Sequence, residues 1–211
     1  MPIFNIKGIS SINTILWKIT ESEEELIRLI SLTNSEKSKL SLIKSSVARK
    51  HYLATLNILR EFGTICHKID YNNFGKPLLI DSYISISHSF EYCVVILDQN
   101  KIGIDIEKFR PKIQKIQNKF ISKKEFDLIG NKTLNNLTKV WTIKEAVFKA
   151  FGKHSIDFKK NIQIKNICKD FEKVVVKIFK ESNVEYYDVQ IINFSQYICS
   201  IAKKKINFEK N

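Results

Sequence analysis

The sequence predicts an α+β fold built from two pseudo-symmetric halves, each a small, mainly antiparallel sheet packed with helices. One observation is that helix-start motifs precede apolar residues at helical spacing in both halves. Another is that each half closes on an apolar hairpin whose last strand holds a cysteine between apolar neighbours. We therefore expect a boundary near residue 100, with halves at 1–100 and 101–211. Clefts form at such junctions, so we expect the active site between the halves.

In the first half, the patterns predict helices between an opening and a closing set of strands. Ser22 and Thr33 each stand three residues before a glutamate, which predicts two capped helices. The closing strand over 92–97 is a continuous apolar run that must be buried on both faces. The expected elements are strands within 4–19, helices over 23–32, after Thr33 and over 45–62, a turn over 71–77, and strands over 83–89 and 92–97.

In the second half, an acidic strand comes first and helices follow it. A capping box at Ser122 predicts a helix start, and Gly152 ends the longest helical pattern. The expected elements are a strand over 101–107, a helix ending near 121, helices over 123–129 and 134–151, and strands over 162–167, 173–179, 185–192 and 197–202.

Composition indicates a globular protein, because 44% of the 211 residues are hydrophobic. No apolar run approaches the ~18 residues that a membrane-spanning helix needs. The first residues lack the basic and apolar regions of a signal peptide, so we expect a cytoplasmic protein. Cys66, Cys93, Cys168 and Cys199 form no CxxC pair and have apolar neighbours, which favours small buried side chains over disulfides or zinc ligands.

The charge is strongly basic, with 35 Lys and Arg against 22 Asp and Glu, a net +13. Net charge steers association without naming the partner, so nucleic acid, an acidic protein and a phosphorylated small molecule all remain candidates. The lysines are scattered, and a general effect on solubility explains them equally well.

The strand over 101–107 places two carboxylates on one face. Alternation puts isoleucines on one side and Gly103, Asp105 and Glu107 on the other. Two such carboxylates repel each other unless a divalent cation or a nearby Lys or Arg neutralises them. A charged edge strand that blocks aggregation is the alternative explanation.

A second pattern lies on the long helix over 134–151. Glu145 and Lys149 are four residues apart and therefore share a face. Alone they would be a surface ion pair of a few tenths of a kcal/mol. Beside Asp105 and Glu107, they add the third carboxylate and the lysine that a Mg²⁺ site for phosphoryl chemistry needs.

These motifs, in this order, are similar to those of the 4′-phosphopantetheinyl transferases of the Sfp type, which are built from two fused halves. The resemblance covers residues 73–149 continuously, and the basic stretch from Arg49 to Tyr52 resembles the family's arginine-rich helix more loosely. The matching motifs are Phe74-Gly75-Lys76-Pro77, Ile86-Ser87-His88-Ser89, Gly103-Ile104-Asp105-Ile106-Glu107, Phe120 with Ser122 and Glu125, and Trp141-Thr142-Ile143-Lys144-Glu145-Ala146 with Lys149.

The resemblance implies transfer of the phosphopantetheine arm of coenzyme A to a serine of an apo carrier protein. It implies that Asp105, Glu107 and Glu145 hold Mg²⁺, although oxygen ligands suit Mn²⁺ as well. Glu145 is the expected general base and Glu107 the alternative. Lys149 is expected to stabilise the transferring phosphoryl group or the leaving bisphosphate.

The resemblance also implies which residues bind coenzyme A. Lys76 and Pro77 would lie against adenine, with Gly75 letting the backbone approach closely. Ser87, His88, Lys144 and Lys149 would face phosphate groups. Lys37 and Arg49, and less clearly His51, are candidates for the 3′-phosphate.

The partner implied is an acidic acyl or peptidyl carrier protein, which explains part of the positive charge. The resemblance implies no nucleic-acid or membrane partner. It also implies a monomer, since two fused halves already build the interface that single-half relatives form by association.

Two other classes of function remain as alternatives. A basic Mg²⁺-dependent nuclease would place its lysine close to a carboxylate on a strand, whereas Glu145 and Lys149 have helical spacing. A non-catalytic nucleic-acid binder would interleave basic and aromatic residues on an exposed sheet, whereas the most patterned strand here is acidic.

Overall fold

The computed structural model describes residues 13–63, 69–73, 75–152, 155–168 and 171–206, together with the backbone of 3–4. Two residues of the sequence analysis, Cys66 and Phe74, lie outside these ranges. Among the described residues, no helix combines the length and the apolar character that crossing a membrane requires.

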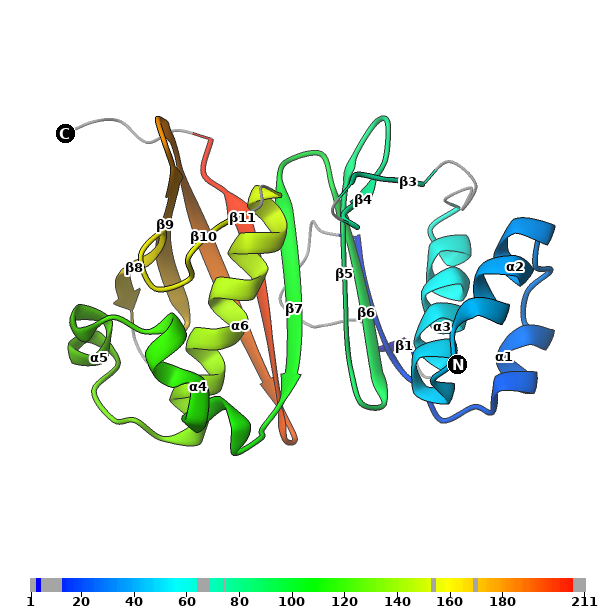
Figure 1. Ribbon diagram of the computed structural model, residues 1–211, viewed down its shortest axis with the longest axis horizontal. Helices are drawn as coiled ribbons and strands as arrows, with labels where there is room; N and C mark the ends of the chain where they lie inside the picture. The colour runs from blue at the N-terminus through cyan, green and yellow to red at the C-terminus, as the bar shows by residue number, and fades with distance from the viewer. Residues whose placement is uncertain are drawn as a thin grey trace.

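The first sheet is antiparallel and has the strand order β1-β2-β6-β5. Its strands are β1 (Ile3–Phe4), β2 (Asn13–Lys18), β5 (Tyr83–Ser89) and β6 (Tyr92–Asp98). The helices α1 (Glu23–Arg28), α2 (Asn34–Leu42) and α3 (Ser46–Glu61) lie together on one side of it (Figure 1). The short strands β3 (Asp70–Tyr71) and β4 (Pro77–Leu78) pair at the two ends of the segment 71–77 that was predicted as a turn.

The second sheet is also antiparallel and has the order β7-β11-β10-β9-β8. Its strands are β7 (Ile102–Lys108), β8 (Ile162–Cys168), β9 (Lys173–Lys180), β10 (Asn183–Phe194) and β11 (Tyr197–Lys204). The helices α4 (Lys112–Phe120), α5 (Lys123–Ile129) and α6 (Leu134–Phe151) accompany this sheet (Figure 1).

Three hydrophobic clusters hold these layers together. One lies between the first sheet and its helices, and another between the second sheet and α4–α6. The third contains residues of both sheets, among them Leu16, Val94, Ile96, Ile102, Ile104 and Ile106. The isoleucine face of β7 therefore packs against the first sheet, which leaves the face with Gly103, Asp105 and Glu107 for α6.

Side-chain hydroxyls join the neighbouring edge strands of the two sheets. The backbone N–H groups of Ile104, Ile106 and Lys108 donate to the hydroxyls of Ser85, Ser87 and Ser89 at 3.0, 3.2 and 3.2 Å. Each pair is separated by 19 residues, so β5 and β7 run parallel in one register. Alternate serines of β5 thus take the place that carbonyl groups have in an ordinary ladder.

The predicted α+β fold with antiparallel sheets and packed helices is confirmed. The capping boxes at Ser22, Thr33 and Ser122 are present, and most predicted boundaries agree within a few residues. The cysteine prediction holds for Cys93 and Cys199, which are buried, and is wrong for Cys168. Cys168 ends β8, the edge strand of its sheet, where one side is open to solvent.

Candidate active site

Close packing of α6 on β7 brings together the residues of the two predicted motifs. A Cβ atom at Gly103 would lie 2.0 Å from the carbonyl oxygen of Ala146 and 2.6 Å from the backbone nitrogen of Ala150. Only glycine allows the helix to approach the strand this closely. The approach sets Glu145 and Lys149 beside the carboxylates of β7.

We expect Gly103→Ala to be strongly disruptive, because its added methyl meets backbone atoms that no side-chain rotation can move. Overpacking of this kind costs about 1–3 kcal/mol or more, and here it also separates α6 from β7. Thermal unfolding and transfer activity measured below the melting temperature should both fall. Gly63→Ala is the control: its methyl meets open space, so it incurs only the cost of a positive φ. Wild-type stability and activity in Gly103→Ala would contradict this account of the packing.

Asp105 is buried and is held by Ser87 and Lys149. Its Oδ1 accepts hydrogen bonds from the Ser87 hydroxyl at 2.9 Å and from Lys149 Nζ at 2.7 Å. Burial raises the pKa of Asp105, and the Lys149 ammonium and Ser87 oppose that rise. Its other oxygen, Oδ2, is also buried and has no hydrogen-bond partner among the described residues. Asp105 therefore has one oxygen available for a further ligand.

Glu107 is bound by side chains that the sequence analysis did not assign to the site. Its Oε1 accepts from Trp141 Nε1 at 3.3 Å, and its Oε2 accepts from Arg110 at 2.8 Å and from the Ser89 hydroxyl at 3.4 Å. Burial and the charge of Asp105 raise the pKa of Glu107, whereas Arg110 lowers it. Ser89 stands in the matching motif Ile86-Ser87-His88-Ser89, and the alternation of serines along β5 places it on the same face as Ser87.

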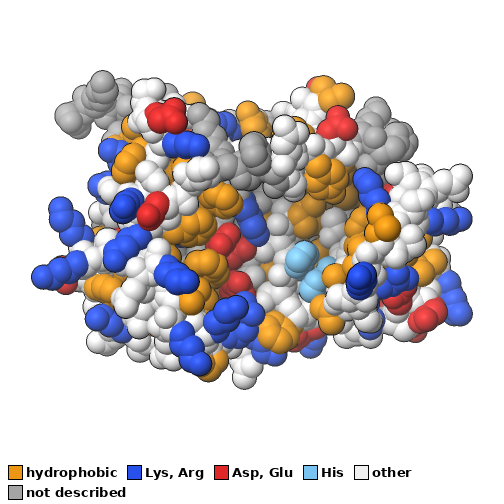
Figure 2. Space-filling view, viewed as in Figure 1, with side chains coloured by type: hydrophobic (Ala, Val, Ile, Leu, Met, Phe, Trp, Pro, Cys, Tyr) orange, Lys and Arg blue, Asp and Glu red, His pale blue; other side chains and the backbone are white. Residues whose placement is uncertain are grey.

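Glu145 is half-buried on α6, where its carboxyl group faces the charges of Asp105 and Glu107. Burial, followed by repulsion from Asp105 and Glu107, raises its pKa to about 7, although Lys149 lowers it. A carboxyl group with this pKa exchanges a proton readily at neutral pH. The space-filling view shows acidic and histidine side chains facing a hollow in the middle of the molecule (Figure 2).

The carboxylate oxygens of this cluster are of the kind that Mg²⁺ prefers, but they are not arranged as a preformed metal site. Among the side chains that the structure describes, no three His, Cys, Asp or Glu residues stand in metal-binding geometry. Lys149 occupies one oxygen of Asp105, and Arg110 pairs with Glu107. The unpartnered oxygen of Asp105 and the mutual repulsion of three carboxylates nonetheless fit a hard divalent cation.

Comparison with known proteins points to one family. Residues 101–202 match the family model described as the 4′-phosphopantetheinyl transferase superfamily. The 4′-phosphopantetheinyl transferase gsp of Aneurinibacillus migulanus is 26% identical over 201 residues, which cover 90% of this chain and 82% of that protein.

The chain is similar to members of this superfamily along most of its length.

The 4′-phosphopantetheinyl transferase Sfp of Bacillus subtilis (strain 168) is 32% identical over 119 residues, 53% of this transferase and 49% of that protein. The predicted family and enzyme class are confirmed. Neither the nuclease nor the nucleic-acid-binding alternative is supported.

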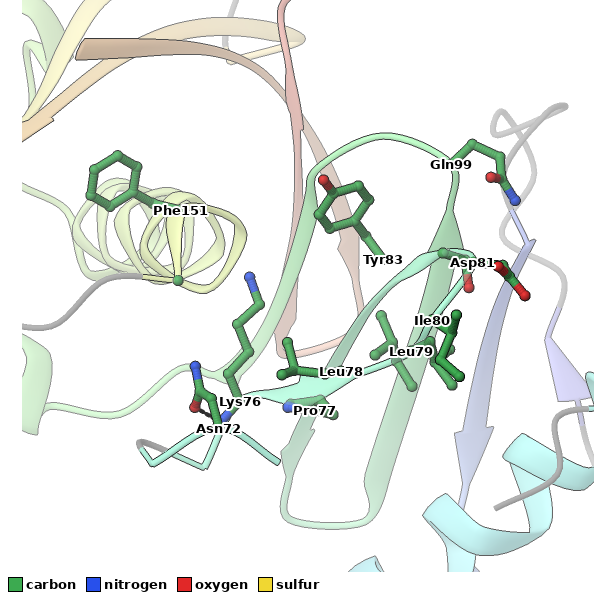
Figure 3. Close-up of a pocket in the computed structure, with 13 residues that line it drawn as sticks. Asn72, Lys76, Pro77, Leu78, Leu79, Ile80, Asp81, Tyr83, Gln99 and Phe151 are labelled. Atoms are coloured by element: carbon green, nitrogen blue, oxygen red, sulfur yellow. Dashed lines mark hydrogen bonds between the residues drawn. The ribbon is translucent and has the colours of Figure 1, made fainter. Parts of the chain in front are cut away.

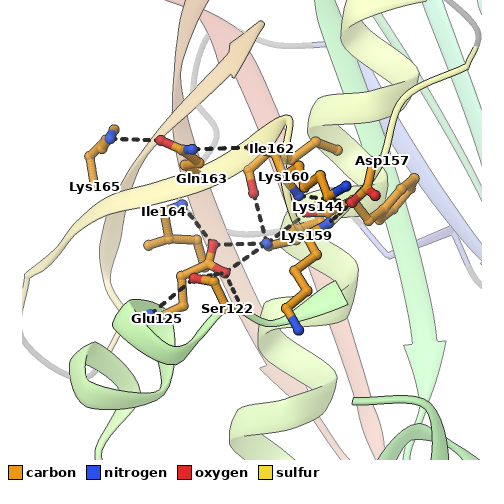
Figure 4. A network of polar contacts seen from close by, with 11 residues as sticks. Ser122, Glu125, Lys144, Asp157, Lys159, Lys160, Ile162, Gln163, Ile164 and Lys165 are labelled. Atoms are coloured by element: carbon orange, nitrogen blue, oxygen red, sulfur yellow. Dashed lines mark hydrogen bonds and ion pairs between the residues drawn. The ribbon is translucent and has the colours of Figure 1, made fainter. Parts of the chain in front are cut away.

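The structure corrects the prediction that Lys144 faces a phosphate group. In the transferase this side chain is fully buried and pairs with Glu125, Nζ to Oε1 at 2.8 Å (Figure 4). Nζ also donates to the carbonyl oxygens of Phe158 at 2.9 Å and Ile162 at 2.7 Å. Three bonds use all the donors of an ammonium group, so Lys144 fastens α6 to α5 and β8 and binds no substrate.

The predicted role of Ser87 in coenzyme A binding also needs correction. Its hydroxyl donates to Asp105 and accepts from Lys149 Nζ and from the backbone N–H of Ile106. These bonds use the one donor and both acceptor positions of a hydroxyl. Ser87 therefore orients the two charged groups of the site, and its side chain has no capacity left for a phosphate.

His88 lies at the surface of the transferase, where its ring stacks on that of His51 with centroids 4.4 Å apart. Desolvation against the protein, then the charges of His51 and Lys149, lower the pKa of His88 to about 4. At neutral pH, His88 would thus meet a phosphate as a neutral N–H donor. Its role in binding coenzyme A stays a prediction.

Lys76 and Pro77 line a cavity of about 410 Å³ between β4, β5 and the end of α6 (Figure 3). Lys76 Nζ donates to the carbonyl oxygen of Ala150 at 3.2 Å, and burial lowers its pKa to about 8. The ammonium group thus meets the negative end of the α6 dipole. Gly75 lies in the turn before β4 and has a φ of 77°, a conformation that glycine adopts without strain.

The basic residues at the first helices of the transferase have partners of their own. Arg49 makes an ion pair with Glu23 and donates to the carbonyl oxygen of Leu40 at 2.8 Å. Lys37 is exposed on α2. The structure does not bring either side chain together with the carboxylates of β7, and their role in 3′-phosphate binding stays a prediction.

Proposed function

We propose that the cluster of Asp105, Glu107, Glu145 and Lys149 catalyses transfer of 4′-phosphopantetheine from coenzyme A to a serine hydroxyl of an apo carrier protein. The serine oxygen forms a bond to the β-phosphorus, the pyrophosphate bond breaks, and adenosine 3′,5′-bisphosphate leaves. The serine proton passes to a base of the enzyme. The observation that carries this proposal is the cluster itself, built from β7 and α6 in a member of the transferase superfamily.

Glu145 is the best candidate for the base. Its pKa of about 7 lets it accept the serine proton and release it again at neutral pH. Glu107 is less suited, because Trp141 and Arg110 already donate to both of its oxygens. Lys149 stands beside Asp105 and is partly exposed, so its ammonium group can turn to a phosphoryl oxygen as charge develops there.

Asp105, Glu107 and Glu145 are proposed as the ligands of Mg²⁺, with Mn²⁺ as an alternative. When bound, the ion would neutralise charge on the pyrophosphate of coenzyme A. The unpartnered Oδ2 of Asp105 supports this assignment. Lys149 has to release Oδ1 of Asp105 if that oxygen is to serve as well.

The 410 Å³ cavity beside Lys76 and Pro77 supports a place for the adenine nucleotide of coenzyme A. Residues 1–100 would then supply contacts to the nucleotide, and residues 101–211 would supply the catalytic groups. We further propose a cytoplasmic monomer whose net charge of +13 favours acidic acyl or peptidyl carrier proteins over nucleic acid.

Incubation with coenzyme A, Mg²⁺ and several apo carrier proteins should add one phosphopantetheine group to a carrier, seen by mass spectrometry. EDTA should abolish the mass increase and excess Mg²⁺ should restore it, because the carboxylates alone cannot neutralise the pyrophosphate. Absence of the increment on every carrier, together with absence of coenzyme A binding by calorimetry, would refute the proposal. Activity that persists in EDTA would refute only the metal assignment.

A further inference from the structure

Phe90 presents an exposed aromatic ring at the turn between β5 and β6. Phe90 is 49% exposed, and its backbone φ is 52°, in the left-handed region that favours glycine. Glu181 and Ser195 have similar φ values at the turns between β9, β10 and β11, so the backbone alone does not distinguish Phe90. Phe90 is distinguished by its exposed ring and by the side chains around that ring.

Two cations of the second half flank this ring. Lys108 Nζ lies 4.9 Å and Arg110 Cζ 5.7 Å from the ring centroid. Arg110 at the same time donates to Glu107 of the catalytic cluster. Arg110 therefore links the Phe90 ring to Glu107, a proposed metal ligand, and the ring lies on the surface beside the cluster.

A groove opens behind the ring. It has a volume of about 310 Å³ and is lined by Ile19, Val47, Lys50, His51, Phe90 and Glu91. Val47 is 56% exposed, and the Nε2–H of His51 donates to the carbonyl oxygen of Phe90 at 2.6 Å, which fixes one wall. Glu91 is the acidic member of this lining and accepts a hydrogen bond from Tyr197.

We propose that Phe90 and this groove, which we name the Phe90 groove, dock the carrier protein by an apolar side chain flanked by carboxylates. The inference rests on the proposed transfer function and names where its protein substrate binds. An exposed aromatic ring with an arginine beside it combines two residue classes that are enriched at protein–protein interfaces. Lys50, Lys108 and Arg110 give the groove a positive rim that complements an acidic partner.

The position of the groove also favours the carrier over coenzyme A. An acceptor serine must reach Glu145, so its protein has to lie on the surface beside the cluster, where Phe90 is linked to Glu107 through Arg110. The cavity beside Lys76 and Pro77 is a separate space, with no lining residue in common with the groove. His51, a candidate for the 3′-phosphate, already uses its Nε2–H on the carbonyl oxygen of Phe90.

The test is Phe90→Gly, assayed with a carrier that the wild type modifies. We expect KM for the carrier to rise about tenfold or more, whereas KM for coenzyme A stays within about twofold. The melting temperature should hold or rise, because glycine suits the positive φ. Glu181→Gly makes the same backbone change at the distant β9–β10 turn and should leave both KM values unchanged. Val47→Gln, on the other side of the groove, should also raise KM for the carrier.

The outcomes separate this inference from the proposed function. If the wild type modifies no carrier, the proposed function itself fails. If the wild type is active and Phe90→Gly keeps its KM for the carrier, the docking inference is overturned. A rise in KM for coenzyme A alone would also overturn it, since the groove would then hold the pantetheine arm.

Discussion

Replacement of Glu145 by glutamine is expected to lower kcat for phosphopantetheine transfer by about 10²–10⁴. The amide keeps the size and the place of the carboxyl group on α6 but cannot take the proton of the acceptor serine. Steady-state kinetics with coenzyme A and a carrier protein measure the loss. Glu172→Gln removes an exposed carboxylate of the same half and should retain full activity.

The same variant should also change how the stability of the metal-free protein depends on pH. The pKa of Glu145 is about 7 in the folded protein and 4.5 in its ordinary state. Between pH 4.5 and 7, the folded protein therefore binds this proton more tightly than the unfolded chain does. Wild-type stability should fall as pH rises across that window, because an ionised Glu145 meets Asp105 and Glu107. Glu145→Gln lacks this contribution, and its melting temperature should exceed that of the wild type increasingly up to about pH 7.

Two results would contradict the assignment. Full activity of Glu145→Gln would leave Glu107 as the base. A difference in melting temperature that does not vary with pH would mean that Glu145 is not crowded by the other carboxylates.

The parts of the fold that follow local rules were predictable from the sequence. Capping boxes fix where helices begin, and the alternation along β7 correctly separated the isoleucine face from the face of Asp105 and Glu107. Helical spacing likewise placed Glu145 and Lys149 together. These features depend on neighbours within a few residues, which the sequence displays directly.

The parts that failed depend on contacts between distant segments. The spacing of residues shows neither the hydrogen bond from Trp141 to Glu107 nor the full use of the Ser87 hydroxyl by Asp105, Lys149 and Ile106. Lys144 shows the same limit. A lysine beside Glu145 in a motif looks like a phosphate ligand, yet its position on the helix turns it into the core.

Loss of the Lys144 ammonium is expected to give the largest change in stability. Lys144→Met keeps most of the apolar stem but leaves Glu125 buried without its ion partner, which costs about 3–5 kcal/mol in such pairs. The carbonyl oxygens of Phe158 and Ile162 lose their donor as well. Chemical denaturation should show the loss as a lower midpoint, and coenzyme A binding by the folded protein should persist.

A double-mutant cycle distinguishes a structural ion pair from a substrate contact. Glu125→Gln alone removes a carboxylate that also caps α5 through Ser122 and accepts from the backbone N–H of Ile164 at 3.0 Å. If Lys144 and Glu125 act on each other, the double variant should lose less stability than the sum of the single variants, because no unpaired charge stays buried. Additive losses, or a rise in KM for coenzyme A in the folded Lys144→Met protein, would restore Lys144 as a phosphate ligand.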